Sequence, residues 1–153
     1  MSRWDRHFMR MAREASTMSK DPSTQVGAVI VDKDRRVVGT GFNGFPRLVS
    51  DNWRLGDRDE KLQIIIHAEM NALLDAGVRA RGGRLYLYGF RSLPCRNCMK
   101  HLIQMDVTTF ISCGPPLPDR WLSSVNKSQE LMREVGGSYW VITNESLEDL
   151  DGI

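Results

Sequence analysis

Apolar residues recur at helical spacing near the start of the chain. Trp4, Phe8 and Met11 fall on one side of a helix with 3.6 residues per turn. The pattern therefore predicts an amphipathic helix over residues 3–19. The segment SKDPST ends it, because Pro22 disfavours helical backbone in the residue before it.

Short runs rich in β-branched and aromatic residues predict five strands, each bounded by turn-forming residues. The runs are VGAVIV at 26–31, VVGTGF at 37–42, RLYLY at 84–88, VTTFISC at 107–113 and SYWVI at 138–142. The first two are joined by the charged turn DKDRR, so they should form a hairpin.

Helices are expected between the later strands. One should run from about 59 to 76 and stop at Gly77, a second opens with PCRNCMKHLIQM at 94–105, and a short one lies around 127–134. Residues 43–59 read as a loop. This order predicts an α/β fold: a three-layer α/β/α sandwich with a five-stranded mixed sheet flanked by helices and right-handed crossovers.

The length of 153 residues and the 41% hydrophobic content indicate one domain with its own core, which we place at residues 1–143. Residues 144–153 are acidic and are expected to form a frayed tail. No apolar run approaches the ~20 residues of a membrane span, and charges throughout the first residues argue against a signal peptide. We therefore expect a cytoplasmic protein without membrane contact. The net charge of +2 suits an anionic small molecule and is too low to indicate nucleic-acid binding.

The three cysteines argue for metal or redox chemistry rather than for a disulfide framework. Cys95 and Cys98 form a C-x-x-C pair at a predicted helix start, where the helix dipole favours thiolates. Cys113 falls in a predicted strand and is expected to be a small buried hydrophobe.

His67, Cys95 and Cys98 make up the three-ligand set of a catalytic zinc site, which leaves a fourth position for water. Adjacent parallel strand–helix units would place both helix starts on one side of the sheet, so residues 28 apart (95 − 67) can meet. Glu69, two positions after the histidine, is then placed to take a proton from that water and deliver it to the substrate.

Each of these residues alone has an ordinary interpretation. The C-x-x-C pair could be a redox pair or half of a structural Cys₄ site, His67 a core residue, and Glu69 a solvated helix residue. Their combination as H-A-E followed by P-C-x-x-C matches the pattern of zinc deaminases. His101 is expected at the surface, and His7 has no metal-like neighbours.

Four segments between residues 4 and 113 carry a family resemblance: SKDPSTQVGAVIV, GFNGFP, HAEMNALL and PCRNC. With them the chain resembles the zinc-dependent cytidine deaminase superfamily, and most closely its deoxycytidylate (dCMP) deaminase branch. The resemblance implies a five-stranded sheet between helices and the reaction of dCMP and water to dUMP and ammonia. Alternatives are another cytosine nucleotide, nucleoside or base, less readily a tRNA adenosine, or a non-catalytic zinc protein, against which the intact Glu69 argues.

The resemblance also implies a substrate-binding set. Asn43 would contact the sugar, Ser19 and Lys20 the phosphate, and Phe45 the region of the sugar, while Thr24, Gln25 and Ala68 would lie beside the pocket. Other interpretations stay open: Asn43 as a turn residue, Lys20 as a helix C-terminal charge and Phe45 as a loop anchor.

Relatives with the GFNG-type loop are often hexamers regulated by dCTP and dTTP. The resemblance therefore implies a homo-oligomer with Mg²⁺-bound nucleotide effectors. The candidate effector residues are Gly41, Gly44, Arg47, Arg54 and Arg58, although solvated charges would explain the arginines equally well.

Two segments depart from the family pattern, Tyr88–Leu93 and Gly114–Trp121. Both touch the expected rim of the pocket, so they bear on the identity of the substrate more than on the chemistry. We expect Arg120 to act as an anion clamp and Trp121 to offer a stacking face.

Overall fold

The computed structural model describes residues 1–148. Its five-stranded sheet has the order β2-β1-β3-β4-β5. The central strands β1 (Gly27–Val31) and β3 (Arg84–Tyr88) are antiparallel, and β1 also pairs in antiparallel fashion with β2 (Val37–Phe42). β3 pairs in parallel with β4 (Thr109–Cys113), and β4 pairs in parallel with β5 (Ser138–Val141). The expected mixed sheet is confirmed.

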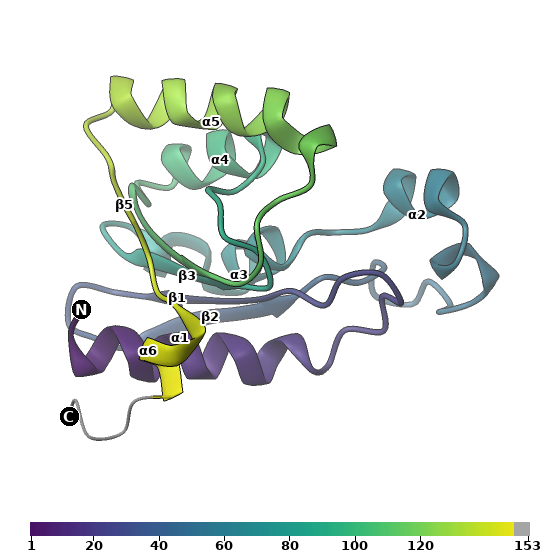
Figure 1. Ribbon diagram of the computed structural model, residues 1–153, viewed down its shortest axis with the longest axis horizontal. Coiled ribbons are helices and arrows are strands. Elements are labelled where there is room, and N and C mark those ends of the chain that lie inside the picture. The colour runs from purple at the N-terminus through teal and green to yellow at the C-terminus, as the bar shows by residue number, and fades with distance from the viewer. Residues whose placement is uncertain (149–153) are drawn as a thin grey trace.

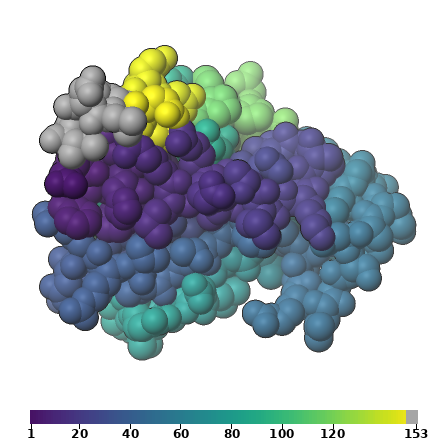
Figure 2. Space-filling model, turned by 90° about the horizontal axis from the view of Figure 1, so that it is seen from below, coloured from purple at the N-terminus to yellow at the C-terminus, as the bar shows by residue number. Residues whose placement is uncertain are grey.

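Helices cover both faces of the sheet (Figure 1). α3 (Ala68–Ala76), α4 (Arg96–Gln104) and α5 (Leu122–Glu134) lie on one face. α1 (Arg3–Ser16) and the short α6 (Asn144–Glu148) lie on the other, which Figure 2 shows from outside. Each face encloses its own apolar core, so the molecule has three layers.

α1 forms where the apolar spacing predicts it. Ser2 caps its first turn through a reciprocal pair of hydrogen bonds with Asp5, and Phe8, Met9 and Ala12 turn into the core. The helix packs directly on β1, where a Cβ at Gly27 would lie 1.9 Å from the Ala12 carbonyl oxygen. Glycine is therefore required at this contact between helix and sheet.

The single helix expected from about 59 to 76 is wrong, because the structure divides it. α2 (Arg58–Ile64) ends before Ile65, whose backbone is extended. Ile66 instead exchanges two backbone hydrogen bonds with Gly44, at 2.8 and 3.1 Å. The run of β-branched isoleucines favours this extended segment. His67 consequently stands at the N-cap of α3 rather than inside a helix.

The strands that carry the two strand–helix units are parallel but not adjacent, which corrects the expected arrangement. β1 lies between β2 and β3, so α3 crosses over it on the way from one to the other. The carboxyl ends of β2, β3 and β4 still lie at one edge of the sheet, the place where α/β sheets position ligands.

The start of the expected frayed tail is ordered, which corrects that expectation for residues 144–148. Residues 144–148 form α6, and its Leu147 is fully buried against the α1 layer. Arg10 donates hydrogen bonds of 3.0 and 2.7 Å to the Leu147 carbonyl oxygen, and Arg13 pairs with Glu148. The remaining tail residues, 149–153, lie outside the described residues.

Three 3₁₀ turns complete the described chain: η1 (Trp53–Leu55), η2 (Gly77–Ala80) and η3 (Asp119–Trp121). Gly77 ends α3 with a positive φ of 56°, as the sequence predicts for a glycine stop. α5 begins at Leu122, earlier than expected. None of the helices in residues 1–148 has the length and apolar character needed to cross a membrane.

Candidate active site

Four side chains from two helices converge at one edge of the sheet. His67 and Glu69 come from the start of α3, and Cys95 and Cys98 from the start of α4. Their ligand atoms all lie within 4.8 Å of one another. The His67 Nδ1 atom is 3.4 Å from the Cys95 sulfur and 3.5 Å from that of Cys98. The structure thus brings together the four residues that the sequence analysis assigned to the metal centre.

Backbone geometry at two helix starts creates this convergence. His67 and Cys95 are both N-cap residues with extended backbone, at ψ angles of 152° and 160°. Cys98 follows one turn later on α4, so both sulfurs face the same point. The free N–H groups and the dipole of the α4 N-terminus favour negative charge on the sulfurs.

The spacing of the ligand atoms fits a tetrahedral zinc ion. With Zn–S of about 2.3 Å and Zn–N of about 2.0–2.1 Å, tetrahedral geometry places nitrogen and sulfur about 3.5 Å apart. The two observed nitrogen–sulfur distances are 3.4 and 3.5 Å. His67, Cys95 and Cys98 would therefore hold a Zn²⁺ ion.

The electrostatics of the cluster stabilise a thiolate. Hydrogen bonding from Cys98 and then from His67 lowers the pKa of Cys95 to about 5, against the opposing effect of burial. In return, hydrogen bonds to Cys95 and Glu69 raise the pKa of His67 to about 10. The neighbouring Cys95 sulfur and burial raise the pKa of Cys98. A cation bound by these residues would displace their protons.

Glu69 lies beside the three ligands and is nearly inaccessible, with 2% of its surface exposed. One carboxylate oxygen is 3.7 Å from the His67 Nδ1 atom. Burial by itself raises the pKa of Glu69, but the hydrogen bond and charge of His67 outweigh it and lower that pKa below its ordinary value. In its carboxylate form this side chain can accept a proton.

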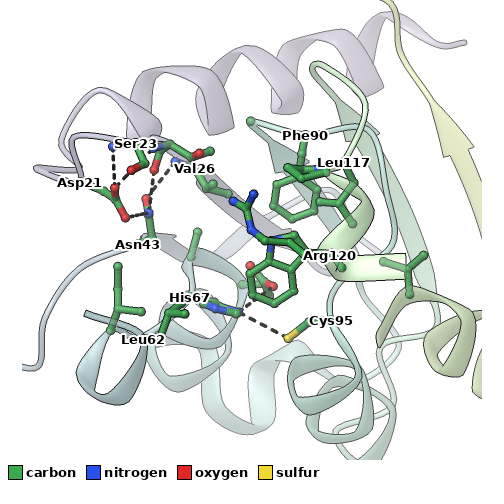
Figure 3. A pocket seen from close by; sticks show the side chains of 18 of the residues that line it. Asp21, Ser23, Val26, Asn43, Leu62, His67, Phe90, Cys95, Leu117 and Arg120 are labelled. Carbon is green, nitrogen blue, oxygen red and sulfur yellow. Dashed lines mark hydrogen bonds and ion pairs between the residues drawn. The ribbon is translucent and has the colours of Figure 1, made fainter. Parts of the chain in front are cut away.

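A pocket of about 280 Å³ opens over this cluster. Its volume is near the small end of the range for small-molecule sites, ~300–1,000 Å³. Figure 3 shows His67 and Cys95 at one end, Asp21 and Asn43 at another, and Arg120 reaching over the space between them.

The Trp121 ring lies edge-on to His67, with the ring centroids 6.0 Å apart and an interplanar angle of 72°. Trp121 and Arg120 come from η3 and line the pocket. An aromatic ring and a cation therefore lie side by side in sequence on the lining of the pocket.

The two unusual rim segments pair with each other. Arg91 donates a backbone hydrogen bond of 2.7 Å to the Pro115 carbonyl oxygen, and Gly89 one of 3.0 Å to Cys113. Gly114 allows this contact with its φ of 144°, since a Cβ there would lie 2.6 Å from the Phe90 backbone nitrogen. The pairing builds the apolar wall of the pocket from segments far apart in the sequence.

Part of the expected binding set lines the pocket and part does not. The residues that line it are Thr24, Asn43, Arg58, Ala68, Arg120 and Trp121, together with His67, Glu69 and Cys95 of the metal centre. Those outside the lining are Ser19, Lys20, Gln25, Phe45, Gly41, Gly44, Arg47 and Arg54.

Several residues outside the lining support the loops behind the pocket. Ser19 donates to the Asn43 carbonyl oxygen at 2.8 Å, and Gln25 to the Ser19 carbonyl oxygen at 2.7 Å. Lys20 pairs with Asp51 at the surface. The Arg54 guanidinium lies 5.7 Å from the centre of the Phe45 ring.

The side chain of Asn43 makes three hydrogen bonds within the protein. Its amide accepts from the Val26 N–H at 2.9 Å and donates to the Thr24 carbonyl oxygen at 2.8 Å and to Asp21 at 3.3 Å. It therefore fixes the loop that forms one wall of the pocket.

Outside the metal centre, His101 is exposed and Cys113 is fully buried in β4, as the sequence analysis predicts. Asp21 and Lys61 also line the pocket, although neither was among the candidate site residues. No local pattern marks them, because their positions depend on the division between α2 and α3.

A His–Cys–Cys zinc site beside a buried glutamate, set at the edge of an α/β/α sandwich, defines a zinc-dependent deaminase. The family model for the cytidine and deoxycytidylate deaminase zinc-binding region matches residues 2–113. The chain belongs to this family.

Sequence relatives cover most of the chain. A protein of Aliivibrio fischeri named "Uncharacterized deaminase in luxG 3'region" is 37% identical over 139 residues, which are 89% of this chain and 91% of that protein. A probable deoxycytidylate deaminase of Drosophila melanogaster is 34% identical over 148 residues, covering 89% and 70% of the two chains.

Solved structures show the same fold. The dCMP deaminase from the cyanophage S-TIM5 in apo form superposes with a TM-score of 0.71 at 20% identity, covering 93% of this chain and all of that one.

Proposed function

We propose that this protein is a zinc-dependent dCMP deaminase, which converts dCMP and water to dUMP and ammonia. The observation that carries the proposal is the buried Glu69 carboxylate beside the clustered side chains of His67, Cys95 and Cys98. Relatives at 34–43% identity that are named as established or probable deoxycytidylate deaminases support this choice of substrate.

The metal centre and Glu69 have separate roles in the proposed reaction. When bound, Zn²⁺ supplies a water molecule whose pKa is lowered toward ~7. Glu69 would accept a proton from that water and give it to the ring nitrogen of cytosine, and would later carry the proton of the hydroxyl added to the ring to the departing amine. Burial keeps its carboxylate out of bulk water, so that the proton stays between the enzyme and its substrate.

Trp121 and Arg120 are proposed to hold the substrate over this centre. The Trp121 ring, edge-on to His67, offers a face to the cytosine ring. Arg120 is exposed on the pocket rim and supplies a cation for an anionic group of the substrate.

Regulation, assembly and cellular location complete the proposal. The protein is proposed to work in the cytoplasm as a homo-oligomer, by resemblance a hexamer, under control of dCTP and dTTP with Mg²⁺. The GFNG loop supports effector control, and the exposed Arg47 beside it offers a charge for an effector phosphate. Arg58 lines the active pocket, which connects it to the substrate instead.

Ammonia release from purified, zinc-loaded protein tests the proposed activity. The panel is dCMP, CMP, dCTP, deoxycytidine, cytosine and a tRNA carrying the target adenosine. We expect the highest kcat/KM for dCMP. A preference for a free base or for RNA, or no ammonia from any compound, would contradict the proposal.

The Glu69→Gln variant tests the assigned proton carrier. The amide keeps the size of the side chain but cannot accept the proton, so kcat should fall by ~10²–10⁴-fold while one zinc per chain is retained. Full turnover in this variant would assign the proton transfers to another group.

A further inference from the structure

The seven-residue helix α2 buries a lysine. Lys61 is the buried residue of this helix, with 8% of its surface exposed, whereas its neighbour Leu62 is 45% exposed. Burying a lysine while the adjacent leucine stays exposed costs free energy, unless the buried ammonium group has charged or polar partners. We propose that Lys61 is a specificity-determining residue that binds the 5′-phosphate of the substrate, an inference that rests on the proposed function.

The Lys61 ammonium group has more N–H donors than oxygen partners within residues 1–148. Its nitrogen lies 3.1 Å from a carboxylate oxygen of Asp21 and 3.5 Å from the Ser23 hydroxyl. An ammonium group carries three N–H donors, so within residues 1–148 two oxygen partners face three donors. Lys61 also lines the substrate pocket. The third donor is available to an anionic group of a bound ligand.

Stability alone does not account for the lysine. Asp21 already accepts hydrogen bonds from the backbone N–H groups of Ser23 at 2.8 Å and Thr24 at 3.3 Å, and from the Asn43 amide at 3.3 Å. A buried ion pair adds little net stability, because desolvation of both charges offsets their attraction. Asp21 therefore acts as a positioning residue that holds Lys61 and Asn43 at one end of the pocket.

The segment that carries Lys61 is directly connected to the segment that carries the metal-centre residue His67. Lys61 precedes His67 by six residues (67 − 61), and the intervening Ile66 is tied to Gly44, the residue after Asn43. Figure 3 shows Asp21 and Asn43 on one side of the pocket, away from the His67–Cys95 pair. A nucleotide with its base at the metal centre would direct its phosphate toward this side.

A second cation strengthens that end. Arg58 lies one turn before Lys61 on α2 and lines the same pocket, although it is exposed. Lysine acts as a compact point charge on phosphate, while arginine adds a planar fork. A dianionic monophosphate would thus meet one buried and one exposed cation on α2, in addition to Arg120 from η3.

The test compares a nucleotide with its nucleoside in the same protein. Zinc-loaded wild type and the Lys61→Met variant are assayed for kcat/KM on dCMP and on deoxycytidine. We expect the ratio of the two values to fall about 10–100-fold in Lys61→Met, mainly through KM for dCMP. A ratio measured within one preparation does not depend on the folded fraction. Lys61→Arg, which keeps the charge, should recover part of the preference.

The matched control is Lys127→Met, which removes an exposed lysine paired with Glu130 on α5, outside the pocket. Its ratio should equal that of wild type. An unchanged ratio in Lys61→Met would overturn the inference while leaving dCMP deamination intact.

Absence of dCMP turnover in the wild type would instead contradict the proposed function. Calorimetric titration with dUMP and deoxyuridine then decides the inference separately. Tighter binding of dUMP that is lost in Lys61→Met supports it, and equal or absent binding of both ligands by the wild type overturns it.

Discussion

Individual buried polar residues show two different uses of charge in this protein. Glu69 is buried beside the metal ligands, where its carboxylate can exchange protons. Asp5, 6% exposed, is buried on the opposite face of the sheet and accepts hydrogen bonds from Ser2 and from the Tyr86 hydroxyl, the latter at 2.7 Å. Asp5 thus ties the first turn of α1 to β3 without any part in the chemistry.

Asp5 should make stability depend on pH. Burial raises its pKa, but hydrogen bonds from Tyr86 and Ser2 together with the charge of Arg84 outweigh this effect and lower the pKa. A carboxylate with a lowered pKa stabilises the fold above its ordinary pKa, and this contribution is lost as pH falls through the folded-state value. Asp5→Asn should therefore cost ~1–3 kcal/mol near pH ~7, with a smaller difference near pH ~3.

Urea unfolding of wild type and Asp5→Asn at both pH values measures this effect, and loss of metal at low pH is common to the two proteins. Asp34→Asn, at an exposed turn position, serves as the control and should change stability little at either pH. A destabilisation by Asp5→Asn that is the same at both pH values would show that the charge is not responsible.

Among the secondary-structure elements, contacts between helices and sheet determine how accurately the site is placed. α3 lies so close to β2 that a Cβ at Gly41 would be 2.4 Å from the Ala68 carbonyl oxygen and 2.5 Å from the Ala72 backbone nitrogen. Ala68 lies between His67 and Glu69. The position of the metal ligand and of the proton carrier therefore depends on a glycine in the neighbouring strand.

Gly41→Ala should displace the first turn of α3. We expect a loss of ~1–3 kcal/mol in the free energy of unfolding, together with weaker zinc binding, measured by competition with a chelator. Gly56→Ala is the control, because its Cβ would meet its nearest neighbour at an ordinary 3.6 Å. Equal effects of the two substitutions on zinc affinity would exclude this role for Gly41.

At the scale of the whole molecule, the metal centre joins segments that are far apart in the chain. One ligand stands at the start of α3 and two at the start of α4, with β3 between the two helices in sequence. A cation bound there would link both helices on one face of the sheet and would favour the folded state over the unfolded chain.

Removal of zinc should therefore lower both stability and activity. A chelator is expected to lower the unfolding midpoint, with a loss of ~4 kcal/mol at a zinc concentration ~1,000 times Kd, and to abolish ammonia release. Adding back zinc should restore both. Cys95→Ser should bind less than one zinc per chain, whereas Cys113→Ala, which changes a buried cysteine outside the cluster, should bind one. Undiminished turnover after complete metal removal would refute the assigned chemistry.

Much of this arrangement follows from the local sequence. Runs of β-branched and aromatic residues predicted the five strands, and apolar residues at helical spacing predicted α1, because these patterns suit the geometry of each element. The H-A-E and P-C-x-x-C spacings indicated the candidate metal ligands and Glu69, because residues two or three positions apart at a helix start lie close together. The meeting of the two motifs, 28 residues apart, depends on the fold.

Tertiary structure decided the rest. The break between α2 and α3 depends on pairing of Ile66 with Gly44, the ordered α6 on burial of Leu147, and the pocket position of Lys61 on its contact with Asp21. Each depends on a partner at least 22 residues away (66 − 44). Local propensity carries no information about such partners. The sequence by itself therefore determined which chemical groups the site contains, whereas packing between the elements determined the walls of the pocket.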